Sequence, residues 1–475
     1  MKFAHAVRVF AAFGAVIFNS QANAQLSAAE KFDIGFTSLQ TRLGIGMPTG
    51  SGISVSQVEA LEGGVNYRPE SAIFPDKAFQ FPSGGSTTAS GHATTVGRYF
   101  YGPDSLAPDI GRAVDSKVVT SYEVGHFLNN SLNVGSASQL PAVEANDVQN
   151  HSWIGTTDNA ATDQQVLRRM DFQIQRDDFV AVFGLNNGSG TPVPNLMAGA
   201  YNGITVGLSN GNHSSGATMI EGARTRPDLV VPTSATSWAA PTVSGAAALL
   251  IETAREMPGL GNGDRSFVVK SILMTGATRD EPEFTAAWTN SSTQPLDATY
   301  GAGELNIDRS HAILTAGEFA ASSTATVGST GWDAGLSSAA ALGLYFFDLS
   351  TQDMVYDVAG TLVWNRAITA VDTQAGPGVN YTFNSTLQNL DLRLFRVSSG
   401  FTPGEQLAAS VSTVDNVEFI TFENLASGRY VWSVSADTTG TEYGFSWVAG
   451  SQVVPEPSVA ALLLALPLVW LRRRR

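Results

Sequence analysis

Residues 236–245 of this 475-residue chain, TSWAAPTVSG, open its strongest helix pattern. The run Trp238–Met257 is rich in alanine and leucine and is followed by a Pro-Gly pair, so it predicts a helix. A serine at a helix start holds its hydroxyl beside N–H groups that lack intrahelical partners. We expect Pro241 to lie in the first helical turn, where its missing N–H costs no hydrogen bond. By itself, Thr236-Ser237 is equally typical of an N-cap on a core helix.

Short apolar segments alternate with small-residue helical runs over residues 25–320. This alternation is typical of a parallel sheet covered by helices, and Trp238–Met257 is one of those helices. The predicted strands are Gly52–Val58, Asp178–Phe183, Gly203–Leu208 and Asp228–Val231.

The pattern changes after a Gly- and Ser-rich junction at Ala320–Gly331. Short segments that mix apolar and polar residues then recur between turn residues, which predicts an antiparallel β-sandwich over residues 321–452. The predicted strands include Gly343–Leu349, Thr361–Trp364, Asp391–Val397, Glu418–Phe422 and Tyr430–Val434. The predicted fold class is therefore an α/β parallel sheet with flanking helices, followed by a β-sandwich.

Two further segments accompany residues 236–245. GHATTVG (91–97) places His92 at a helix start, and an apolar strand at 180–183 runs into LNNG (185–188). In this order, the three segments resemble the His, oxyanion-Asn and Ser motifs of subtilisin-like serine peptidases (subtilases). The resemblance implies that Ser237 is the nucleophile and His92 the general base, and that Asn186 donates to the oxyanion. Asn187 is the alternative donor.

Three other segments resemble the same family. NHSW (150–153) is similar to the edge segment that hydrogen-bonds to extended substrate, which implies a substrate-binding role for Ser152 and Trp153. RPDLVVP (226–232) is similar to the strand that leads to the nucleophile, and YGAGELN (300–306) to the segment that closes the fold. The resemblance spans Ile53–Leu314 and implies a subtilisin-like fold for residues 25–320.

The orienting acid departs from the family pattern. Subtilases carry an Asp at the end of the first core strand, whereas here the strand beginning at Ile53 ends in Glu59. Glu59 precedes His92 by 33 residues (92 − 59), and a Glu can fix the imidazole tautomer if its extra methylene is accommodated. Asp76, in a loop-like context, is the less favoured alternative. Ala235 also replaces the usual Gly before Thr236-Ser237, which adds a Cβ at a place where a tight turn is expected.

Both ends of the chain have the patterns of targeting signals. Residues 1–24 combine a basic start, an apolar run and the small-x-small site Ala22-Asn23-Ala24, which is typical of a secretory signal. Residues 453–475 contain Pro455-Glu456-Pro457, a short apolar stretch and four arginines. This tail resembles the PEP-CTERM sorting signal of Gram-negative bacteria. The resemblance implies transient inner-membrane retention, processing by an exosortase, and delivery to the cell surface or extracellular matrix.

Composition excludes several classes of function. The chain has no cysteine, which excludes disulfides and thiol chemistry, and its net charge of -15 opposes nucleic-acid binding. No paired-His motif predicts a metal site, and structural calcium, common among subtilases, is not assignable to any loop.

The GLSNG segment at 207–211 satisfies the G-x-S-x-G nucleophile pattern but is followed by loop residues, so Ser209 is expected to end a core strand.

Two functions follow from these observations. The first is an exported serine endopeptidase that hydrolyses a polypeptide substrate through Ser237, His92 and Glu59, without a cofactor. The second is a catalytically degenerate surface protein that binds matrix polysaccharide or protein on the same scaffold. The substitutions at Glu59 and Ala235 motivate the second.

Overall fold

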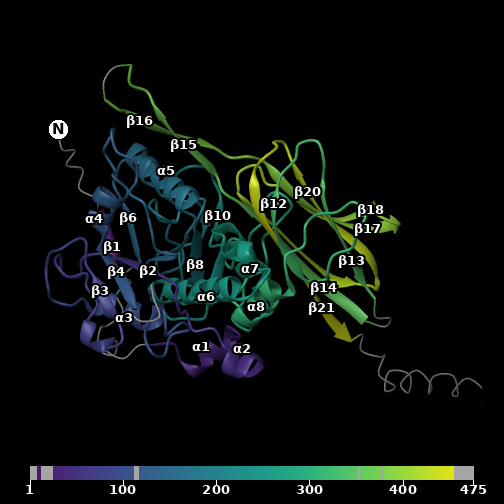
Figure 1. The fold of residues 1–475 in the computed structure, drawn as a ribbon, viewed down its shortest axis with the longest axis horizontal. Helices are drawn as coiled ribbons and strands as arrows, with labels where there is room; N and C mark the ends of the chain where they lie inside the picture. The colour runs from purple at the N-terminus through teal and green to yellow at the C-terminus, as the bar shows by residue number, and fades with distance from the viewer. Residues whose placement is uncertain (1–7, 12–24, 112–116, 351–353, 376–377, 454–475) are drawn as a thin grey trace, which may run out of the picture.

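A parallel sheet forms the centre of the first part of the chain (Figure 1). The computed structural model describes residues 8–11, 25–111, 117–350, 354–375 and 378–453. Within them, the seven strands run in the order β11-β8-β7-β5-β2-β4-β3, and every neighbouring pair is parallel. Their bounds are β2 Val55–Glu59, β3 Ala78–Gln80, β4 Val118–Glu123, β5 Val148–His151, β7 Val180–Gly184, β8 Ile204–Leu208 and β11 Leu229–Val231. The four strands predicted in this part match β2, β7, β8 and β11, with ends shifted by at most three residues.

Helices cover both faces of this sheet because both faces of its strands are apolar. In β7, Val180 and Val182 pack with α3 and α6 in one core cluster, whereas Ala181 and Phe183 pack with α5 in another. The long helix α6 is buried from Thr236 to Ala254. The helices are α1 Ala28–Asp33, α2 Phe36–Leu43, α3 Gly91–Phe100, α4 Val124–His126, α5 Ala160–Asp177, α6 Thr236–Glu256, α7 Ser266–Gly276 and α8 Ile307–Ala316.

Two four-stranded antiparallel sheets form the second part. Their strand orders are β12-β21-β14-β19 and β13-β20-β17-β18, and the hairpin β15–β16 stands apart from both. Tryptophan and tyrosine side chains fill the space between the sheets, among them Trp364, Trp432 and Trp447. The strands are β12 Gly331–Leu336, β13 Gly343–Leu349, β14 Met354–Trp364, β15 Ala367–Asp372, β16 Tyr381–Thr386, β17 Leu390–Ser399, β18 Thr402–Ser410, β19 Val417–Leu425, β20 Gly428–Ala436 and β21 Glu442–Val453.

The sandwich shares its core with the first part. Trp332, Val363, Val417 and Phe419 of the sandwich belong to the same apolar cluster as the helices on the α6 face of the parallel sheet. The two parts also meet closely at Gly444, where an added Cβ would lie 2.7 Å from the carbonyl oxygen of Phe267 in α7. The sandwich is therefore packed onto the α/β part and is not tethered to it by a linker alone.

Short two-stranded pairs complete the described structure: β1 Arg8–Ala11 with β6 Trp153–Thr156, and β9 Gly216–Ala217 with β10 Thr225–Arg226. No helix among these residues is long and apolar enough to span a membrane. The small-x-small site at 22–24 and the tail beyond Val453 lie outside the described residues.

Candidate functional site

Glu59 and His92 form a buried hydrogen-bonded pair. The Glu59 Oε2 atom lies 2.7 Å from the His92 Nδ1 atom, and the two side chains are 0% and 7% exposed. Glu59 is the last residue of β2, and His92 is the second residue of α3, whose N-cap is Ser90. The glutamate thus reaches the histidine across the carboxyl end of the sheet in spite of its extra methylene.

A second set of hydrogen bonds holds Glu59 in place. Gln57 Nε2 donates to Glu59 Oε1 at 2.8 Å, and Tyr101 Oη donates to Gln57 Oε1 at 2.6 Å. Burial, and then the negative charge of Glu59, raise the pKa of Tyr101 well above its ordinary value, so the phenol keeps its proton. Gly97 leaves room for this phenol, since an added Cβ would lie 2.6 Å from Tyr101 Oη. Sequence reasoning missed both Gln57 and Tyr101.

Glu62 anchors the start of α3. It is a third site residue that the sequence did not predict. Its Oε2 atom accepts hydrogen bonds from Ser90 Oγ at 2.6 Å and from the His92 backbone N–H at 3.2 Å. Glu62 therefore fixes the backbone of His92, and Glu59 fixes its ring.

Ser237 is the second residue of α6, and the residue after it packs against His92. The ring of Trp238, the next residue, packs against the His92 ring with centroids 5.4 Å apart. Ser237 is 3% exposed, and none of the described residues forms a hydrogen bond with its hydroxyl. Buried hydroxyls are usually paired, so the unpaired hydroxyl of Ser237 is a signal of function. Ala235 has φ −152° and ψ 148°, an extended conformation that any residue adopts, so this position does not require a glycine.

Pro241 occupies a different turn from the one predicted. Because α6 begins at Thr236, Pro241 is its sixth residue and lies in the second turn, where its missing N–H leaves the carbonyl of Ser237 without an intrahelical donor. Ser152 Oγ supplies the hydrogen bond instead, at 3.0 Å from the Ser237 carbonyl oxygen. The expectation that the proline costs no hydrogen bond was wrong, and Ser152 compensates for it.

Of the two adjacent asparagines, Asn187 is the one whose side chain contacts the start of α6. Its Oδ1 atom accepts from the backbone N–H of Thr236 at 2.9 Å and from Thr236 Oγ1 at 3.1 Å. Asn186 is held through its backbone, which exchanges hydrogen bonds with Ser214. The structure therefore brings Asn187 to the start of α6 through its side chain, whereas the sequence favoured Asn186 as the oxyanion donor.

Ser152 and Trp153 are buried. Ser152 is 1% exposed and accepts from Asn150 Nδ2 at 3.0 Å, and Trp153 is also 1% exposed and donates through Nε1 to His151 at 3.1 Å. Their side chains face the core, so only their backbone is placed for contact with a ligand. The strand β6 that begins at Trp153 pairs in antiparallel register with β1, from Arg8 opposite Thr156 to Ala11 opposite Trp153.

The other candidate residues take structural positions. Asp76, the alternative acid, is half-exposed and binds Lys77 and Lys117, not His92. Ser209 directly follows β8 and precedes a turn, as predicted, and no helix begins there. Burial lowers the pKa of His151 to about 3 and that of His213 to about 4, so both stay neutral.

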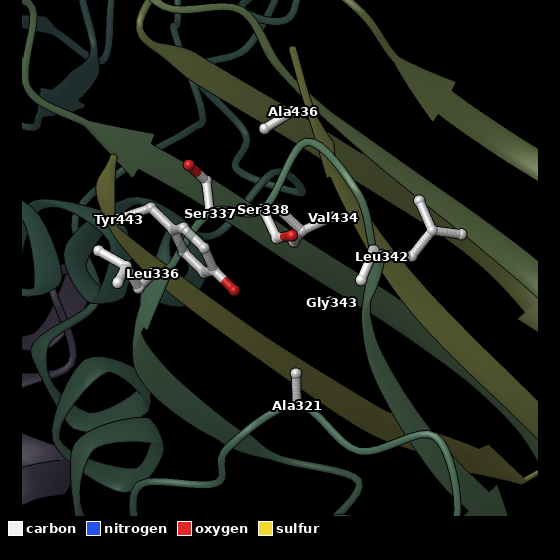
Figure 2. A pocket seen from close by; sticks show the side chains of 10 residues that line it. Ala321, Leu336, Ser337, Ser338, Leu342, Gly343, Val434, Ala436 and Tyr443 are labelled. Atoms are coloured by element: carbon white, nitrogen blue, oxygen red, sulfur yellow. The ribbon is translucent and has the colours of Figure 1, made fainter. Parts of the chain in front are cut away.

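A pocket lies apart from these residues, at one end of the sandwich (Figure 2). All of its lining residues belong to the sandwich or to the segment before it, and Leu336 and Leu342, on its wall, are more than half exposed. Tyr443 forms part of the lining and bonds to Tyr345, which donates to the buried Asp333. Among the described residues, no cluster of three or more His, Asp or Glu side chains could hold a metal ion.

No model of a protein family matches the chain, and no curated protein gives a significant match.

Proposed function

We propose that the protein is a serine endopeptidase of the subtilisin type. The observation that carries this proposal is the buried pair of Glu59 and His92, 2.7 Å apart, with the His92 ring packed against Trp238. Trp238 directly follows Ser237, whose buried hydroxyl has no hydrogen-bond partner among the described residues. The order Glu59, His92, Ser237 along the chain, at the carboxyl end of a parallel sheet, supports the same reading.

In the proposed reaction, the Ser237 hydroxyl attacks the scissile carbonyl while the His92 ring takes its proton. Glu59 accepts the hydrogen bond from Nδ1, so Nε2 is the nitrogen that receives this proton, and the carboxylate stabilises the imidazolium. The protonated ring then returns the proton to the leaving amine. Water repeats the sequence on the acyl-enzyme and releases Ser237.

Two donors are available for the oxyanion. The backbone N–H of Ser237, in the first turn of α6, has no intrahelical acceptor. The Asn187 side chain must turn its oxygen to the Thr236 N–H, because two donors cannot pair. The donor that this side chain would offer an oxyanion is therefore Nδ2. We therefore assign this role to Asn187.

Extended substrate would bind along β6. The pairing of β1 with β6 supports this role, since it is the antiparallel register that a peptide adopts when it adds to a sheet edge. Arg8–Ala11 lies within the proposed secretory signal, so cleavage after Ala24 would free the edge. Signal removal and PEP-CTERM processing would deliver the enzyme to the cell surface or matrix.

The proposal is tested by hydrolysis of denatured casein and of a fluorogenic peptide library. Secreted wild-type protein, with its new N-terminus at Gln25, is expected to cleave both. Ser237→Ala is expected to lose at least ~10³-fold in kcat, since removing a member of such a triad leaves only the contribution of binding and of the oxyanion donors. Equal hydrolysis by wild type and Ser237→Ala would reject the assignment.

A further inference from the structure

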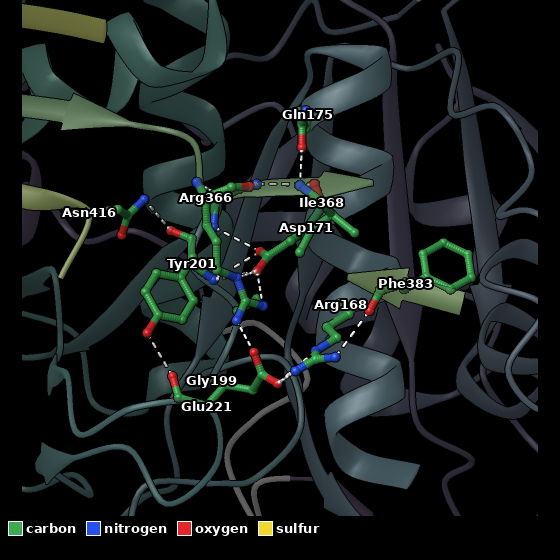
Figure 3. Close-up of polar contacts among 12 residues, drawn as sticks. Arg168, Asp171, Gln175, Gly199, Tyr201, Glu221, Arg366, Ile368, Phe383 and Asn416 are labelled. Atoms are coloured by element: carbon green, nitrogen blue, oxygen red, sulfur yellow. Dashed lines mark hydrogen bonds and ion pairs between the residues drawn. The ribbon is translucent and has the colours of Figure 1, made fainter. Parts of the chain in front are cut away.

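The hairpin β15–β16, here called the arm, leaves the sandwich and lies along α5 on the far side of the parallel sheet from α6 (Figure 1). Phe383 in β16 packs edge-to-face on Phe172 of α5, with ring centroids 5.4 Å apart. The backbone N–H of Ile368 in β15 donates to Gln175 Oε1 at 2.7 Å (Figure 3). Both strands of the arm are thus fixed to one helix of the α/β part.

The arm also holds the segment 132–142, which lies between α4 and β5 in the sequence. The backbone N–H of Tyr381 donates to the Ala137 carbonyl at 2.6 Å. The guanidinium of Arg169 lies 4.3 Å from the ring centroid of Phe383, and its nitrogens donate to three carbonyl oxygens of this segment. These acceptors are Leu132, Ser136 and Gln139.

This segment shares a hydrophobic core cluster with β6. Leu132 belongs to the same apolar cluster as Trp153 of β6 and as Leu167 and Met170 of α5. Protein interiors are close-packed, so a displacement of one buried side chain is transmitted to its neighbours. A shift of α5 or of residues 132–142 would therefore reach the strand along which substrate would bind.

A buried ion-pair network fixes the base of the arm. Arg366 donates to Asp171 of α5 through Nε at 3.0 Å and Nη2 at 2.6 Å, and its Nη1 donates to Glu221 (Figure 3). Asp171 also accepts from the backbone N–H groups of Tyr201 and Asn202. Because leaving one buried charge unpaired is costly, this network selects a single orientation of the arm.

We propose that Phe383 and Arg366 are positioning residues through which the sandwich holds β6 in place for extended peptides. This inference rests on the proposed function and deepens it. The arm touches neither Ser237 nor His92, so its loss should weaken binding of long substrates and leave the chemical step intact. The sandwich then contributes to substrate affinity through α5 and residues 132–142, and not by binding substrate itself.

Phe383→Ala in the secreted, signal-processed protein tests this inference. We expect KM for an extended fluorogenic peptide to rise about tenfold, since small misplacements of a binding element cost one to two orders of magnitude. We expect kcat for p-nitrophenyl acetate to stay within about twofold, because that substrate does not use β6. Phe383→Leu keeps an apolar contact with Phe172 and should recover most of the loss.

Amide hydrogen exchange provides a readout that does not need activity. Phe383→Ala should speed exchange at residues 132–142 and 153–156, while Phe401→Ala, which removes a ring from the sandwich's own contact with Phe346, should leave both segments unchanged. An unchanged KM in a folded Phe383→Ala enzyme, or unchanged protection of both segments, overturns the inference. A wild type that hydrolyses neither substrate rejects the proposed function instead, and exchange alone then decides whether the arm positions β6.

Discussion

Ser152 Oγ lies 3.0 Å from the carbonyl oxygen of Ser237 and takes the place of the N–H that Pro241 lacks. This hydrogen bond ties the segment that leads into β6 to the first turn of α6, where the proposed nucleophile lies. It thus joins the proposed substrate strand to the proposed reacting group through one side chain.

Ser152→Ala is expected to leave the buried Ser237 carbonyl without a donor and to lower the free energy of unfolding by ~1–3 kcal/mol. Urea denaturation measures this loss. Ser398→Ala, at an exposed position on β17, is the matched control and should change stability by less than about 0.5 kcal/mol. Ser152→Thr keeps the hydroxyl and should restore part of the stability; equal stability of Ser152→Ala and wild type would mean that this hydrogen bond is not formed.

Glu59→Gln tests the orienting role of the carboxylate. Both oxygens of Glu59 accept hydrogen bonds, from Gln57 and from His92, so an amide must set its NH₂ group against one of these donors. We expect kcat to fall by up to ~10⁴-fold, the cost of the comparable Asp-to-Asn change in another serine peptidase. Steady-state kinetics on the fluorogenic peptide measures it.

Glu59→Asp distinguishes the two functions drawn from the sequence. Its carboxylate would end about 1.5 Å short of the His92 ring, one C–C bond, so an active wild type should become slower. Hydrolysis that appears only in Glu59→Asp would instead favour the degenerate surface protein.

Asn187→Asp separates the oxyanion role from the structural one. Aspartate keeps the oxygen that accepts from Thr236 but has no Nδ2 donor, so we expect kcat to fall ~10²–10³-fold while the contact with Thr236 is kept. Asn186→Ala is the matched variant and should retain kcat. The reverse ranking of the two variants would return the oxyanion role to Asn186.

We predict that the stability of the fold depends on pH through the buried carboxyl of Glu304. Its carboxyl is buried, which raises its pKa to about 8 from an ordinary value of 4.5. Between these values the folded chain keeps a proton that the unfolded chain releases, so stability falls as pH rises, by up to ~1.4 kcal/mol per pH unit. Glu304→Gln has no proton to lose, so the thermal midpoint of the variant should fall less between pH 5 and 8. Identical pH profiles for variant and wild type would contradict this assignment.

Sequence patterns were most informative where local chemistry decides structure. Apolar runs located strands β2, β7, β8 and β11, and the end of the first of these runs indicated Glu59 as the partner of His92. The choice between Asn186 and Asn187 depended on which side chain faces Thr236, which adjacent positions in a turn do not reveal. Pro241 was misplaced because the helix begins two residues earlier than its apolar pattern, and element ends are weakly encoded.

Long-range partners were beyond sequence reasoning. Gln57 and Tyr101 lie 44 positions apart and meet only because β2 and α3 pack together. The base of the arm is a second example, because Arg366 pairs with Asp171, 195 positions away in the sequence. A single sequence contains no local sign of such pairs, since each residue looks like an ordinary polar side chain until the fold is assembled.

Labelling with a fluorophosphonate probe tests the central claim most directly. The probe reacts with a serine only when a base and an oxyanion site activate that serine. Labelling therefore reports on the combined action of Ser237, His92 and Glu59. We predict one adduct per chain, mapped by peptide mass spectrometry to Ser237, and none in Ser237→Ala. A folded, signal-processed protein that takes up no probe, or takes it up at another serine, would contradict the account.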